Sequence, residues 1–327
     1  MLELPAFPSA DTRLKNVLVI TYSQTGQLAD VTAQVVAPLR AAGHFVHQEV
    51  LQPVTPFPWP WPIVQFVDAM PECVQEDPPP LKPLGIPANI DFDLVILSYQ
   101  VWYLSPALPI TAFMQSVEAR RLLAGKPIVT LVACRNMWLA AHDAMQRMIA
   151  SVGGKLRDHV VLVDQGHALA TFVTTPRWVL TGKRDRWLGL PPAGVAPEEI
   201  RRASRFGRAL VDALASDSEK QEAPMLTGLQ AVEVNPRLAM SERAVRRAFG
   251  VWSRLIRCFG QRGSWTRRPI LAVFALYLIT MILTVVPISL LLQWLLAPLL
   301  RPRLERMRQQ LELPSGSQDF NLAKYEY

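Results

Sequence analysis

The chain has 327 residues, half of them hydrophobic, which is enough for one folded domain with appended segments. Its formal net charge is +7, and much of this charge lies between Arg237 and Arg268, where nine arginines accompany a single acid, Glu242. A basic segment of this kind predicts contact with an anionic surface. The sequence contains no recognisable nucleic-acid-binding module, so we expect anionic lipid and not nucleic acid as the partner.

Three cysteines are present, Cys73, Cys134 and Cys258, and they are far apart and odd in number. Such spacing predicts neither a disulfide framework nor a metal site. The N-terminal stretch MLELPAFPSADTR lacks the basic start and apolar core of a signal peptide. We therefore expect the folded domain to lie in the reducing cytoplasm.

Apolar, strand-like runs alternate with helical patterns from residue 14 to about residue 215. Continuous apolar runs are typical of buried parallel strands. Strands that alternate with crossover helices form a parallel sheet covered on both faces, so we expect a doubly wound α/β domain at residues 14–215. The predicted strands are Asn16–Thr21, His44–Leu51, Asp93–Tyr99, Lys126–Ala133 and Asp158–Asp164, and the predicted helices cover residues 28–43, 111–125, 138–154 and 196–215.

Two insertions interrupt this alternation. Residues 53–87 contain too many prolines for regular elements. Residues 168–195 carry two tryptophans and several cations, and we expect a loop there as well. Long loops in a compact domain tend to bind ligands or to act as lids.

The composition changes after the predicted domain. Residues 216–240 are typical of a polar linker, and residues 241–260 predict an amphipathic basic helix. One face of this helix carries Phe249, Trp252 and Ile256, while the opposite face is rich in arginine. This is the composition of a helix that lies at a membrane interface, and packing on the domain is the alternative.

Residues 269–300 form a segment without a charged side chain. A membrane-spanning helix needs only ~20 residues, so we predict a transmembrane or re-entrant segment that holds the domain at the cytoplasmic face of the membrane. Arginines flank the segment on both sides, which favours a cytoplasmic location of both ends. A re-entrant hairpin and a single tilted span both stay open. Residues 301–327 predict a short charged helix followed by disorder.

The turn YSQTGQ, residues Tyr22–Gln27, follows the first predicted strand and precedes a helix. In a doubly wound sheet this turn lies at the carboxyl edge, where ligands bind. Ser23 and Thr25 offer hydroxyl groups, Gly26 allows close approach to the backbone, and the helix N-terminus favours an anion. The lysine of a nucleotide triphosphatase loop and the glycines of GxGxxG are absent. The turn therefore predicts a site for a phosphate monoester.

The stretch VLVITYSQTGQ resembles the phosphate loop of flavodoxin-like proteins, of the type S/T-x-T-G-x-T, with Leu28 in place of the last hydroxyl residue. This resemblance implies the strand order 2-1-3-4-5 and FMN as the cofactor. It also implies that residues 99–109 and 134–139, after the third and fourth strands, hold the flavin ring, and both loops contain aromatic side chains suited to stacking. The implied cofactor-binding residues are Ser23, Gln24, Thr25, Gly26, Gln27, Tyr99, Gln100, Trp102, Tyr103, Arg135, Asn136 and Trp138.

Five stretches, YSQTGQL, PFPWPW, YQVWYLSP, ACRNMW and LTGKRDRWLG, together resemble one branch of these proteins, the dialkylresorcinol condensing enzymes of aryl-lipid biosynthesis. The resemblance covers roughly residues 14–215. It implies a flavin-dependent oxidoreductase that aromatises an alkylated cyclic diketone to a resorcinol, with a ketosynthase as partner enzyme. A lipid-like substrate would explain the membrane segment. A homodimer is left open.

Aromatising a cyclohexanedione removes two hydrogens, so a flavin accepts a hydride while a base removes the acidic proton between the carbonyls. Arg135 is the candidate for holding a carbonyl oxygen or the pyrimidine edge of the flavin. Two alternatives stay open: Cys134 as the nucleophile of a condensing enzyme without flavin, and an electron carrier or quinone reductase. The candidate bases or acids are His167, which is the first choice, Tyr103, His142 and Asp164.

Overall fold

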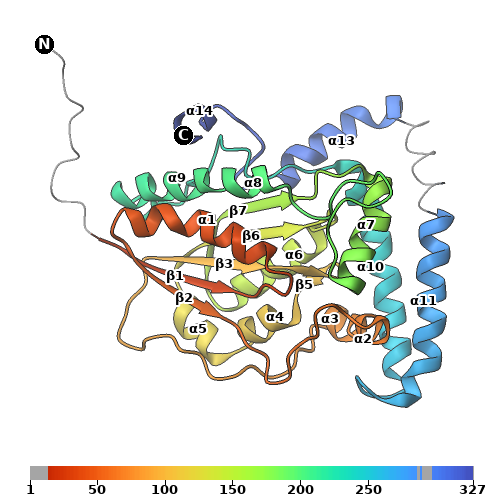
Figure 1. Ribbon diagram of the computed structural model, residues 1–327. Helices are drawn as coiled ribbons and strands as arrows, with labels where there is room; N and C mark the ends of the chain where they lie inside the picture. The colour runs from red at the N-terminus through yellow and green to blue at the C-terminus, as the bar shows by residue number, and fades with distance from the viewer. Residues whose placement is uncertain (1–13, 286–287, 289–296, 327) are drawn as a thin grey trace, which may run out of the picture.

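A computed structural model describes residues 14–285, 288 and 297–326 of the protein (Figure 1). At its centre lies a five-stranded parallel sheet in the order β2-β1-β3-β6-β7, which is the predicted 2-1-3-4-5 order of a flavodoxin-like fold. The prediction of the fold class is therefore confirmed. The strands are β1 (Asn16–Thr21), β2 (Phe45–Val50), β3 (Leu94–Tyr99), β6 (Pro127–Cys134) and β7 (Lys155–Val163), and a small hairpin pairs β4 (Val101–Trp102) with β5 (Ser105–Pro106).

Helices cover both faces of the sheet, which explains why its central strands are apolar throughout. The residues of Val17–Ile20 on β1 and Leu94–Leu97 on β3 are completely buried. α1 (Gln27–Ala41) and α9 (Ser204–Ala215) lie on one face, and α4 (Leu108–Met114), α5 (Val117–Leu123) and α6 (Leu139–Ser151) lie on the other (Figure 1). Gly207 allows α9 to approach α1 closely, because a Cβ at this position would lie 2.1 Å from the carbonyl oxygen of Val35.

Some predicted boundaries differ from the structure. The helix expected at residues 111–125 is interrupted at Ser116, whose Oγ caps α5 by accepting a hydrogen bond from the backbone N–H of Ala119. The insertion at 168–195 is not wholly a loop, because it contains α7 (Ala168–Thr181). The proline-rich insertion contains two short helices, α2 (Ile63–Asp68) and α3 (Met70–Gln75), and α8 (Pro197–Arg202) precedes α9.

Residues 216–240 do not form a free linker. After a single 3₁₀ turn (Ser218–Lys220), the side chains of Leu226 and Leu229 are buried in the core of the domain. The carbonyl oxygen of Ala231 accepts a hydrogen bond of 2.8 Å from the backbone N–H of Val161 on β7. The folded unit therefore extends beyond residue 215.

The predicted amphipathic helix is present as α10 (Pro236–Arg257), but part of its apolar face is buried inside the protein. Phe249 and Ile256 pack with Met70 of α3 and with Phe274 of α11 (Arg268–Leu283). The expectation that this face lies on a bilayer is therefore wrong for Phe249 and Ile256, which α3 and α11 cover, whereas Leu255 and Phe259 of the predicted face are 42% and 46% exposed. Both α10 and α11 stand at the carboxyl edge of the sheet, toward which the strand arrows point (Figure 1).

The C-terminal tail returns to the domain instead of ending in disorder. After α13 (Ala297–Leu311), the chain reaches α14 (Leu322–Tyr325) beside α9, where Lys324 lies 2.8 Å from Asp212 in an ion pair. Within the described residues, one helical stretch, Trp265–Leu283, is long and apolar enough to cross a membrane. Residues 286–287 and 289–296 of the predicted membrane segment lie outside the described residues.

Candidate functional site

The loop between β1 and α1 retains groups suited to a phosphate. Gly26 has a left-handed backbone with φ of 84°, and the space that a Cβ would occupy there contains no atom within 4 Å. The Oγ of Ser23 is buried and has no hydrogen-bond partner among the described residues. Leu28, at the position of the missing hydroxyl, is completely buried in the core. The loop thus offers an unused hydroxyl and an approachable backbone at the N-terminus of α1.

Gln24 fastens the proline-rich segment to this loop. Its Oε1 accepts a hydrogen bond of 2.7 Å from the indole Nε1 of Trp61, and its Nε2 donates one of 2.7 Å to the carbonyl oxygen of Pro58. Its backbone N–H donates to Oε1 of Gln100 over 3.1 Å. Gln24 and Gln100 were both predicted to bind the cofactor. In this structure their side chains form hydrogen bonds with other residues of the protein.

The aromatic side chains predicted to stack on a flavin have protein partners. Trp102 packs edge-on against Tyr22, Phe57 and Trp61, with ring centroids 4.9–5.8 Å apart. Tyr99 is buried in the core, so its ring belongs to the packing of the sheet. Stacking of these rings on a flavin stays a prediction.

Tyr103, the third of these aromatic residues, lies beside the C-terminal helices. Its hydroxyl donates to the carbonyl oxygen of Phe66, and its ring packs against Phe66 and against Phe249 of α10. Burial raises the pKa of Tyr103 well above its usual range, so the phenol stays protonated at neutral pH. These contacts connect the β3 loop to α2 and α10.

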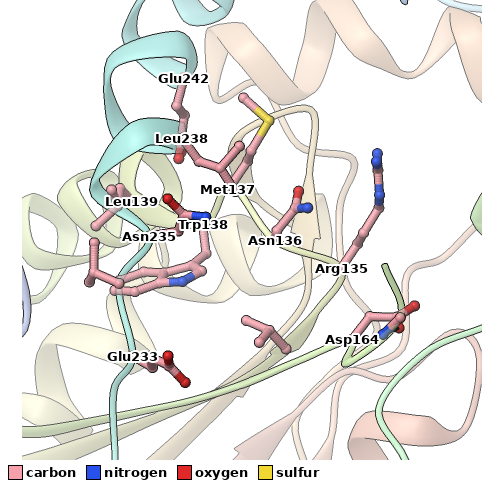
Figure 2. Close-up of a pocket in the computed structure, with 13 residues that line it drawn as sticks. Arg135, Asn136, Met137, Trp138, Leu139, Asp164, Glu233, Asn235, Leu238 and Glu242 are labelled. Atoms are coloured by element: carbon pink, nitrogen blue, oxygen red, sulfur yellow. Dashed lines mark hydrogen bonds between the residues drawn. The ribbon is translucent and has the colours of Figure 1, made fainter. Parts of the chain in front are cut away.

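A pocket of about 250 Å³ opens at the carboxyl ends of β6 and β7 (Figure 2). Residues 135–139 after β6 form one side, and the start of α10 forms another, with Leu238 and Glu242 projecting toward the loop that carries Asn136 and Met137 (Figure 2). Glu233 and Asn235, from the segment before α10, complete the wall. The pocket lies at the carboxyl edge of the sheet, where open α/β sheets bind ligands, on the β6–β7 side of the switch point between β1 and β3.

Glu242 is the functional candidate that the sequence patterns did not identify. The residue is only 1% exposed, and its Oε1 accepts a hydrogen bond of 2.7 Å from the backbone N–H of Ala140 at the start of α6. Its Oε2 is buried and has no hydrogen-bond partner among the residues that the structure describes. Burial raises the pKa of Glu242 to about 7, although the N–H groups of Ala140 and Leu139 act in the opposite direction. The one signal in the sequence was its isolation among nine arginines.

Arg135 lines the same pocket, and its side chain contacts two residues of α7. Its Nε donates a hydrogen bond of 2.9 Å to Oγ1 of Thr171, and its guanidinium lies 3.9 Å from the ring centre of Phe172. Burial lowers the pKa of Arg135 to about 10, so the group remains a cation at neutral pH. It is a fixed positive charge beside the pocket.

Asp164, a candidate acid or base, forms hydrogen bonds with the backbone through both of its carboxylate oxygens. Its two carboxylate oxygens accept hydrogen bonds of 2.7 Å each, one from the N–H of Gly166 and the other from the N–H of Gly194. It thereby ties the end of β7 to the loop before α8. His167 follows this turn and is exposed at the start of α7, outside the set of residues that lines the pocket.

Trp138 and two histidines form a buried cluster beside the pocket. The imidazoles of His142 and His159 stack with centroids 3.8 Å apart, and Trp138 packs against both. Burial lowers the pKa of His142 to about 4, so the ring is neutral at pH 7. Cys134, at the end of β6, has a pKa raised by burial well above its ordinary value. Its thiol is therefore protonated, which disfavours a nucleophilic role.

Removing the hydroxyl of Ser23 tests the phosphate loop. We expect Ser23→Ala to raise the Kd for FMN by about 10–100-fold, because a hydrogen bond to a charged group contributes roughly 1.5–3 kcal/mol. Stability should not fall, since this hydroxyl has no partner to lose among the described residues. Titration of FMN fluorescence measures the Kd. The control is Ser151→Ala, which removes a hydroxyl at the far end of α6, and equal affinities of all three proteins would contradict the assignment.

The buried His142 predicts sensitivity to acid. Its pKa in the folded protein, about 4, lies below the unfolded value of 6.5, so the stability it contributes is present above pH 6.5 and is lost as the pH falls through 4. Between pH 7 and pH 4 the unfolding free energy of the unsubstituted protein should fall. We expect that of His142→Leu to fall by on the order of 3 kcal/mol less. Urea unfolding at both pH values measures this difference. An unchanged loss in the variant would show that other groups cause the acid sensitivity.

Comparison with known proteins identifies no family for this chain. No protein-family model matches the chain, and no curated protein does. A flavoprotein in complex with FMN from Lactobacillus acidophilus is similar in structure, with 14% identity and a TM-score of 0.37 over 45% of this chain and 93% of that one. A flavodoxin from the domain Archaea has 9% identity and a TM-score of 0.34, covering 61% of this chain and 98% of its own. A flavone reductase has 13% identity and a TM-score of 0.34, with 65% and 68% covered. Likenesses this distant carry no argument about what this chain binds.

Proposed function

We propose that this protein is an FMN-dependent oxidoreductase that aromatises an alkylated cyclohexane-1,3-dione to a resorcinol. The observation that carries the proposal is the carboxyl group of Glu242, which is buried in a pocket at the carboxyl edge of the sheet and whose Oε2 has no hydrogen-bond partner among the described residues. We infer that this group accepts a proton from a molecule bound in the pocket.

The chemistry of a 1,3-diketone suits a base of this strength. Aromatisation breaks two carbon–hydrogen bonds on adjacent ring carbons: a base removes the proton α to one carbonyl, a hydride leaves the neighbouring β carbon, and the other carbonyl enolises. A general base for the α proton works best when its pKa lies near the operating pH. Burial raises the pKa of Glu242 to about 7, so the carboxylate is both partly ionised and able to hold a proton at neutral pH. The Ala140 N–H fixes Oε1, which leaves Oε2 to take the proton.

The residues near the start of α1 fit the phosphate of FMN. Ser23 offers a buried hydroxyl, and Gly26 leaves the backbone open. β3 alone separates β1 from β6 in the sheet, so the carboxyl ends of β1 and β6 are about 10 Å apart at the usual strand spacing. A cofactor with its phosphate at Ser23 therefore reaches the side of the pocket that Asn136 lines. When bound, a flavin supplies a two-electron acceptor for the hydride that leaves the ring as the second carbon–hydrogen bond breaks.

The remaining pocket residues orient the substrate. Arg135 places a fixed cation beside the pocket, which favours negative charge that develops on a carbonyl oxygen as the proton leaves. Cys134 is protonated, so the alternative of a cysteine-based condensing enzyme without flavin has less support. A ketosynthase that supplies the diketone, and a location at the cytoplasmic face of the membrane, belong to this proposal as expectations from the sequence.

Purification of the full chain tests the proposal directly. We expect a yellow protein that releases FMN on denaturation and that, without oxygen, converts an alkylated cyclohexane-1,3-dione to the resorcinol while its visible absorption bleaches. A colourless protein that does not bind added FMN would contradict both flavin-dependent functions, the oxidation of a diketone and the reduction of a quinone. Oxidation of NAD(P)H with a quinone, without any reaction of the diketone, would instead favour a quinone reductase.

A further inference from the structure

The exposed face of α11 is apolar and has no covering element among the described residues. Leu271 and Phe274 face α10 and are buried, whereas the side chains of Leu276, Ile279 and Leu283 are 65%, 53% and 70% exposed. Trp265, just before the helix, is 76% exposed. A contiguous apolar face of this kind marks a contact with lipid or protein.

Three features favour lipid as the occupant. The uncharged sequence continues from Pro269 to Leu300, well past the end of α11, and arginines stand at both of its ends. An exposed tryptophan beside arginines is typical of the boundary between headgroups and hydrocarbon. The exposed side of the neighbouring α10 carries further arginines, including Arg247 and Arg254, which suit anionic headgroups.

The chain before the apolar segment is anchored in the folded domain. Arg267 is completely buried, and its guanidinium forms ion pairs of 3.2 Å with Asp68, the last residue of α2, and of 3.0 Å with Glu72 in α3. Asp68 also accepts a hydrogen bond of 2.7 Å from the backbone N–H of Gly263. Arg267 immediately precedes α11, so this helix starts at the surface of the domain.

The chain after the apolar segment is anchored in the same domain. The hydroxyl of Ser315 is buried, donates over 2.8 Å to Asp158 on β7, and accepts over 2.9 Å from the N–H of His159. Glu312 accepts a hydrogen bond of 3.2 Å from the N–H of Val234. Closer to the segment, Leu304 of α13 is also buried.

A single span would separate these two anchors by the ~30 Å hydrocarbon core of a bilayer, yet both lie on one folded unit. Two complete spans need ~40 residues, more than the stretch from Pro269 to Leu300 provides. We propose that α11 inserts into one leaflet as a monotopic attachment, with both ends of the apolar segment on the side of the membrane that carries the domain. This inference does not depend on the reaction proposed above.

Cysteine labelling of the full chain tests this topology. In a Cys258→Ser background, Gln261→Cys and Asp319→Cys place one exposed thiol before and one after the segment. In inverted bacterial membrane vesicles we expect a membrane-impermeant maleimide to label both positions equally, and in intact spheroplasts neither. Labelling of one position in each preparation shows a single span and overturns the proposal.

A substitution on the exposed face tests the occupant. Leu276→Glu/Leu283→Glu is expected to reduce the membrane-bound fraction at least tenfold, because acidic side chains insert poorly into hydrocarbon. Val117→Glu, at an exposed apolar position of α5, is the matched control and should remain bound. If the unsubstituted protein stays in the soluble fraction at twice the mass of one chain, the face is an interface between two copies and the lipid proposal fails.

Discussion

Glu242→Gln is expected to lower the rate of diketone oxidation by about 10²–10⁴-fold, the usual contribution of a general base. Glutamine retains an oxygen that accepts the hydrogen bond from Ala140, so the start of α6 stays capped. What the variant loses is the capacity to take a proton. The rate is measured in a single turnover with FMN bound, which makes it independent of the final electron acceptor.

The pH dependence separates a base from a structural residue. In the unsubstituted protein the rate should rise with pH up to about 7, where Glu242 ionises, and then level off. The variant should lack this rise. Glu233→Gln, the same chemical change at an exposed position of the pocket wall, is the control and should retain the profile. If Glu242→Gln oxidised the diketone at the full rate, Glu242 would have only a structural role as the cap of α6.

Stability gives a second, independent reading of the same carboxyl group. The pKa of Glu242, about 7 when folded, lies above the ordinary value of 4.5, so its stabilising contribution is complete below pH 4.5 and is lost as the pH rises through 7. The loss amounts to on the order of 3 kcal/mol. As the pH rises through 7, the unfolding free energy of Glu242→Gln should therefore decline less than that of the unsubstituted protein, by this amount.

Arg267→Met is expected to reduce the free energy of unfolding by about 3–5 kcal/mol, because it leaves the carboxylates of Asp68 and Glu72 buried without their cation. Both residues are less than a tenth exposed. Urea unfolding in mild detergent, followed by tryptophan fluorescence, measures the change. The loss should loosen the contact between the proline-rich insertion and the start of α11.

Two further variants identify the cause. Arg268→Met removes the neighbouring arginine, which is exposed, and should change the unfolding free energy by less than about 1 kcal/mol. Adding Asp68→Asn and Glu72→Gln to Arg267→Met removes the uncompensated charges and should restore much of the lost stability. If the triple variant were as unstable as Arg267→Met, lost packing of the long side chain would explain the effect.

The sequence was sufficient for the sheet and for the turn after β1 because both depend on local patterns. Buried parallel strands require continuous apolar runs, and each predicted strand overlaps the strand observed, from Asn16–Thr21 to Lys155–Val163. A turn at the carboxyl edge with a glycine in a left-handed conformation is likewise encoded locally, at Gly26. These features need no knowledge of which distant segments meet.

The rest was decided by tertiary contacts between segments far apart in the chain. The amphipathic pattern of α10 fixes that one face is covered, but whether lipid or protein covers it depends on α3 and α11, which no helical period specifies. Glu242 became a candidate base only because α10 folds onto the loop after β6, more than 100 residues earlier, where burial raises its pKa. A tertiary contact also fixes the C-terminal tail, because the hydroxyl of Ser315 donates a hydrogen bond to Asp158 on β7. This contact keeps the chain after the apolar segment on the folded domain and so limits how the segment can enter a membrane.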